Sequence, residues 1–112
     1  LQALATLNDT TYVETARHLG RRMMEAAEEP HGRLQFGARA VLSRQLRGEE
    51  LAVLDAALAR HMKDFGADPD AARELLGAGA TAPPVETRTP EWAAYTMIAS
   101  TLLNLDEALT KR

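Results

Sequence analysis

The chain has 112 residues, of which 46% are hydrophobic, 26% charged and only 4% aromatic. This composition predicts one compact domain with an aliphatic core and excludes a disordered or fibrous protein. The formal net charge of −3 is too close to balance for a dedicated polyanion binder. Cysteine is absent, which excludes disulfides, thiolate metal sites and covalent haem attachment within these residues. No apolar run approaches the roughly 18 to 20 residues that span a bilayer, so we expect no membrane insertion.

The chain opens with a short apolar stretch, residues 1–7, whose leucines are spaced for one face of a helix. Asn8 and Asp9 interrupt this stretch. A second, amphipathic helix is expected over about residues 11–27, with Arg17 and the other charged side chains largely off its buried face. Its buried stripe is formed by Tyr12, Val13, Ala16, Leu19, Met23 and Ala27.

Three further helices follow in the predicted order. Residues 30–32, Pro-His-Gly, are expected to end the preceding helix, and a third helix runs from about 33 to 42. The fourth has two glutamates in its first turn and apolar residues at helical spacing over 49–65, and Gly66 closes it. Aspartate followed by proline then starts a short helix over 68–77.

A long loop and a last helix complete the chain. Residues 77–89 are rich in glycine, proline and small side chains, which predicts a surface loop. Thr89 and Pro90 then start the last helix, which we expect to be central. Its buried side contains Trp92, Tyr95, Ile98, Ala99, Leu102 and Leu103. The sequence therefore predicts an all-α fold: one domain over 1–112, a compact bundle of five to six helices with one long Gly/Pro-rich loop before the last.

Two short polar clusters are the strongest candidates for chemistry. Asn104, Asp106 and Glu107 directly follow the most apolar stretch of the chain, and Asn8 and Asp9 follow the first one. Such amides and carboxylates could form an acid/base pair or a sugar-binding cluster if the two turns met in space. The simpler interpretation is that they end helices by bonding backbone groups, so we predict no catalytic residue.

The histidines predict neither a metal site nor another cofactor. His18, His31 and His61 lie on separate stretches, and His18 shares a predicted helix face with Glu14, four residues before it. Two ligands are too few for zinc or iron, and the same pair is equally a surface hydrogen bond. His61 borders an apolar stripe and is better interpreted as a half-buried core histidine than as a base.

Charge is distributed unevenly between the two parts of the chain. Residues 1–48 contain seven Lys and Arg against five Asp and Glu, a net of +2, whereas residues 49–112 contain six against eleven, a net of −5. The arginines of the first part could belong to a helix-turn-helix reader of nucleic acid: Arg17, Arg21, Arg22, Arg33, Arg39, Arg44 and Arg47. Solvated helix faces explain them more simply, so we expect no nucleic-acid partner.

Several blocks resemble the planctomycete-type domain of unknown function family 1553. Residues 1–9, LQALATLND, resemble its opening signature, and the YVETA block at 12–16 is similar to the apolar helix that follows it. AVLSR at 40–44 with the later EEL at 49–51 is similar to a junction between two family helices, and 92–107 looks like the C-terminal signature. This chain has QLRG at 45–48 where the family commonly has prolines.

The resemblance spans nearly the whole chain, and it covers the C-terminal part of a family domain. It implies a large exported bacterial protein, sometimes with a cytochrome-c-like domain elsewhere, and it transfers no established catalytic residue. We therefore expect the C-terminal fragment of a larger polypeptide, located in the periplasm or at the cell surface.

The predicted function is a non-catalytic scaffold or interaction module, whose partners are upstream domains of the same polypeptide. The alternative is one wall of a polysaccharide-processing active site that those domains complete. Apolar faces around Leu1, Leu4 and Leu7 also predict weak self-association.

Overall fold

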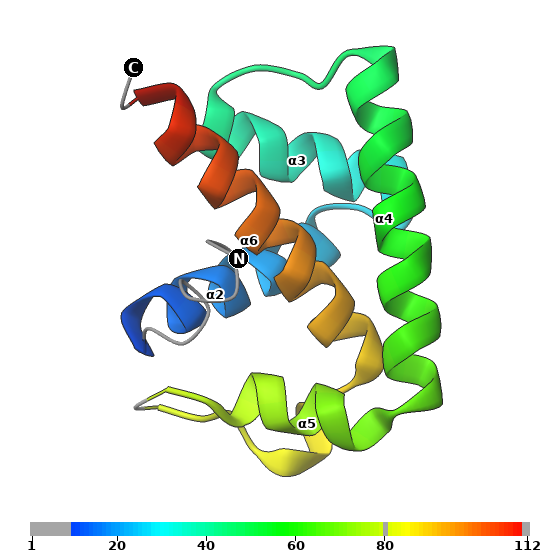
Figure 1. Cartoon of the computed structure of the whole chain (residues 1–112), viewed down its shortest axis with the longest axis vertical. Helices are drawn as coiled ribbons and strands as arrows, with labels where there is room; N and C mark the ends of the chain where they lie inside the picture. Colours follow the sequence, from blue (N-terminus) through cyan, green and yellow to red (C-terminus); the bar gives the residue numbers. More distant parts are fainter. Residues whose placement is uncertain (1–9, 80, 111–112) are drawn as a thin grey trace.

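The computed structural model describes residues 10–79 and 81–110. Over these residues the fold is built from α-helices with one 3-10 turn, and no strand occurs among them (Figure 1). The elements are α2 (Thr10–Ala26), α3 (Pro30–Leu42), α4 (Gly48–Ala67), α5 (Pro69–Gly77), η1 (Val85–Thr87) and α6 (Pro90–Thr110). The predicted all-α bundle with a loop before its last helix is confirmed. The apolar stretch at 1–7 lies outside the described residues.

Helix α6 is the centre of the bundle, as its sequence predicts. It contacts α2, α3, α4 and α5, and in Figure 1 it runs diagonally between them. It is buried around most of its circumference, which is typical of a core helix without a strong polar face. Its buried residues are Trp92, Ala93, Ala94, Tyr95, Thr96, Ile98, Ala99, Ser100 and Leu102, while Leu103 is only half-buried.

The backbones of α2 and α6 touch at Gly20. A Cβ atom at Gly20 would lie 2.9 Å from the backbone nitrogen of Thr96 and 3.1 Å from the carbonyl carbon of Tyr95. Gly37 of α3 is similarly enclosed, here by the side chains of Met23 and Leu102. The missing side chain at Gly20 is therefore what sets the distance between the two helices.

The helix ends correct two sequence expectations and confirm two others. Residues 30–32 do not end a helix: Pro30 is the first residue of α3, where a missing N–H is tolerated because it has no intrahelical partner. The Asp68 carboxylate caps α5 by accepting from the backbone N–H of Ala71 at 3.2 Å, as predicted. The Thr89 hydroxyl likewise accepts from Trp92 N–H at 3.2 Å and starts α6. Helix α4 runs one residue past Gly66.

The side chain of Arg17 is buried, which contradicts its assignment to a solvated helix face. Only 2% of the residue is exposed. Its guanidinium donates to three carbonyl oxygens, at 3.2 Å to Leu76, 2.7 Å to Ala78 and 2.8 Å to Thr81. These carbonyls belong to the end of α5 and the loop after it, where a cation complements the negative end of the helix dipole. Arg17 therefore fastens α5 and the start of the loop to α2.

Two neighbouring contacts strengthen this junction. The Glu14 carboxylate accepts from the backbone N–H and the hydroxyl of Thr81 at 2.9 and 3.1 Å. The indole N–H of Trp92 donates to the Arg17 carbonyl at 3.0 Å, and the Arg21 guanidinium lies 4.3 Å from the centre of the indole ring. The start of α6 is thus bonded to the same turn of α2 that holds the loop.

We predict that Gly20→Ala lowers the free energy of unfolding by about 1–3 kcal/mol, because the new methyl group meets backbone atoms that cannot rotate away. Urea denaturation followed by circular dichroism measures this loss. Gly66→Ala is the matched control, since a Cβ there meets nothing within 4 Å. Replacing that helical glycine by alanine should raise stability by up to about 1 kcal/mol. Equal effects at both positions would contradict the close approach.

We predict that Arg17→Met lowers the free energy of unfolding by about 2–4 kcal/mol, because three carbonyls lose a charged donor and two of these bonds are shorter than 3 Å. Hydrogen exchange should show the residues around Leu76 losing protection first. Arg39→Met, at an exposed arginine of α3, is the control and should change stability by less than about 0.5 kcal/mol. A stability of Arg17→Met equal to the control would contradict the fastening role.

Candidate functional site

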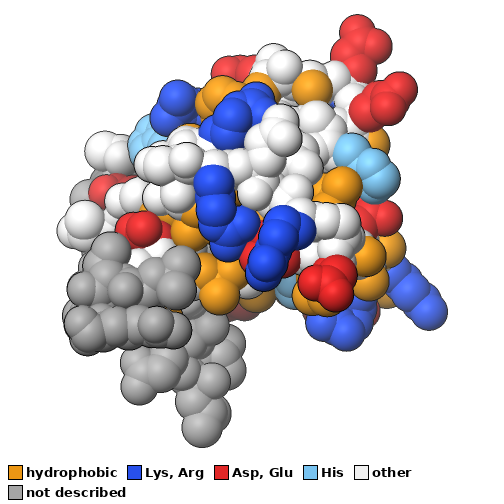
Figure 2. All heavy atoms as spheres, turned by 90° about the horizontal axis from the view of Figure 1, so that it is seen from above, with side chains coloured by type: hydrophobic (Ala, Val, Ile, Leu, Met, Phe, Trp, Pro, Cys, Tyr) orange, Lys and Arg blue, Asp and Glu red, His pale blue; other side chains and the backbone are white. Residues whose placement is uncertain are grey.

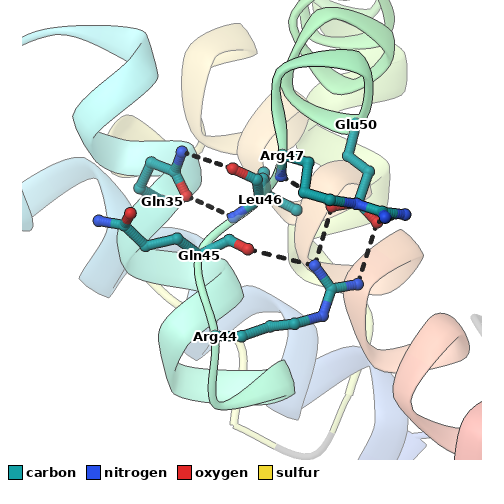
Figure 3. A network of polar contacts seen from close by, with 6 residues as sticks. All are labelled: Gln35, Arg44, Gln45, Leu46, Arg47 and Glu50. Carbon is teal, nitrogen blue, oxygen red and sulfur yellow. Dashed lines mark hydrogen bonds and ion pairs between the residues drawn. The ribbon is translucent and has the colours of Figure 1, made fainter.

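The linker between α3 and α4, residues 43–47, is held in one shape by side-chain bonds. Ser43 adopts the left-handed conformation, with φ of 61°, and its N–H reaches the Arg39 carbonyl to end α3. The Gln35 amide then binds Leu46 in both directions: its nitrogen donates to the Leu46 carbonyl at 3.2 Å, and its oxygen accepts from the Leu46 N–H at 2.7 Å (Figure 3). These two bonds keep the linker beside α3, with the Leu46 side chain buried.

The Glu50 carboxylate, in the first turn of α4, binds groups from both Arg44 and Arg47. Its two carboxylate oxygens accept from the Arg44 guanidinium at 2.8 and 3.0 Å, and one of them also accepts from the backbone N–H of Arg47 at 2.8 Å (Figure 3). The hydrogen bonds from Arg44 and then from Arg47 lower the pKa of Glu50 to about 2. The Arg47 guanidinium is less engaged, at 3.8 Å from the carboxylate and with 76% of its side chain exposed.

An apolar groove of about 460 Å³ lies between this linker, α4 and the last turns of α6. In Figure 1, α4 and α6 lie close together at the bottom and separate toward the top, where the linker crosses. The groove is lined by Leu42, Arg44, Leu46, Glu50, Val53, Leu54, Thr101, Leu105 and Ala108. No motif or charge pattern in the sequence predicts this groove.

The groove leaves aliphatic side chains in contact with water. Val53 is 67% exposed and Leu105 is 45% exposed, and both are among the large hydrophobic residues that the fold does not cover. The polar side chains of the lining are few, and Arg44 and Glu50 are bonded to each other. The site can therefore bind an apolar surface, but its lining does not place an acid beside a base for catalysis.

The predicted polar cluster lies only partly within the described residues. Asn104 and Asp106 are half-buried on α6, and Glu107 is exposed. Burial raises the pKa of the Tyr12 phenol, and the nearby charge of Glu107 raises it further, so this carboxylate is near α2. Asn8 and Asp9 lie outside the described residues. A meeting of the two turns therefore stays a hypothesis.

Most of the arginines considered for nucleic-acid binding contact other residues of the fold. Arg17 is buried, and Arg21 and Arg22 lie over the rings of Trp92 and Phe36. The Arg33 guanidinium donates to Glu91 at 3.1 Å. Arg44 is bonded to Glu50. A phosphate would have to compete with Glu91 and Glu50 for the guanidinium groups of Arg33 and Arg44.

The histidines do not converge on a shared site. His61 is half-buried as predicted, and burial, followed by the charge of Arg60, lowers its pKa. His31 lies 3.7 Å from Asp55 at an exposed position. Over residues 10–79 and 81–110, no three His, Asp or Glu side chains are grouped in a way that could hold a metal ion.

Within the same part of the chain, no helix combines the length and the apolar character needed to cross a membrane.

A smaller cleft of about 290 Å³ lies between α3, α4 and α6. Its lining includes the carboxylates of Glu28, Asp55 and Glu91, together with Arg33 and the ring of Tyr95. Arg33 is already paired with Glu91 and lies 5.3 Å from the centre of the Tyr95 ring. This cleft is therefore occupied by contacts of the fold itself, and the apolar groove remains the stronger candidate site.

Comparison of the sequence and the structure with protein-family models, curated proteins and solved structures gives no match.

We predict that the contribution of Glu50 to stability depends on pH with a defined sign. Its pKa falls from 4.5 to about 2 on folding, so its stabilisation is present above pH 4.5 and is lost as the pH falls toward about 2. The difference in unfolding free energy between the natural chain and Glu50→Gln should therefore be largest near neutral pH and shrink with acidification.

Urea denaturation at a series of pH values measures this difference. The matched control is Glu86→Gln, at an exposed glutamate of η1, measured over the same pH range. A difference for Glu50→Gln that is independent of pH would show that the pair with Arg44 does not hold the carboxylate in its charged form.

Proposed function

We propose that this chain is a non-catalytic helical interaction module of a multidomain exported bacterial protein, and that it docks other parts of the same polypeptide in the apolar groove. The observation that carries the proposal is the exposure of Val53 and Leu105 on facing helices of one groove. A contiguous apolar surface rimmed by charged residues is typical of a protein-protein contact.

The size of the groove favours a partner that is covalently linked. Fully burying an aliphatic side chain contributes about 1.5–3 kcal/mol, and part of this is already gained because Leu105 is less than half exposed. A few such side chains support only weak association between separate molecules. A linked partner is present at a high effective concentration, so the same contacts become sufficient.

The location of the module is part of the same proposal. The resemblance to the planctomycete-type family supports an exported polypeptide with further domains, placed in the periplasm or at the cell surface. The absence of a paired acid and base in the groove lining supports docking rather than catalysis.

We predict that a photo-crosslinking residue at Val53 captures another segment of the same polypeptide. The experiment places p-benzoylphenylalanine at this position in the polypeptide produced by its native gene, and mass spectrometry identifies the crosslinked peptides. The expected products join position 53 to residues upstream of Leu1.

Val85 is the matched control because it is similarly exposed, at 56%, but lies outside the groove. Crosslinks to upstream residues should be absent or much fewer from position 85. The proposal is wrong if position 53 gives no more of these products than position 85.

A further inference from the structure

We draw no further inference here: the strongest candidate, the apolar groove between α4 and α6 at the end of the bundle where basic, acidic and hydrophobic side chains are intermixed (Figure 2), belongs to the site already described, and nothing in the structure shows what covers it.

Discussion

The fold depends on the burial of α6 between residues 92 and 102. A helix that is apolar around most of its surface is stable only if other elements cover most of it, and here α2, α3, α4 and α5 do so. The tightest of these contacts is with α2 at Gly20, where backbone meets backbone. The same turn of α2 contains Arg17, whose bonds position α5 and the loop against the core. Packing around one helix therefore determines where the remaining elements lie.

The groove follows from this arrangement. Helix α6 crosses α4 at an angle, so the two helices separate toward the end where the linker passes. Gln35 holds the linker beside α3, and Glu50 holds the first turn of α4 against Arg44. These polar bonds keep the linker in a defined shape at the rim, and the space between α4 and α6 stays lined by aliphatic side chains. A rigid rim is suited to binding because little conformational entropy is lost on contact.

The helices could be predicted from the sequence because their apolar residues recur every three or four positions. The groove and the burial of Arg17 could not be predicted from the sequence. Arg17 was assigned to solvent by its charge, and only the folded chain brings the carbonyls of Leu76 and Ala78 to it. The bond between Gln35 and Leu46 joins residues on different elements, and the sequence carries no local signal for it. Val53 is an apolar residue of α4, and the sequence does not show that its exposed side chain lines a groove with Leu105 of α6.

Trp92 is an intrinsic fluorescence probe of this fold. It is the single tryptophan of the sequence, it is almost completely buried, and its indole bonds the backbone of α2 while a guanidinium covers the ring. The fluorescence of Trp92 reports on the junction of α2, α5 and α6. This residue does not line the groove between α4 and α6. Separation of α6 from α2 would shift the fluorescence to the red, so unfolding of the core can be followed without any label.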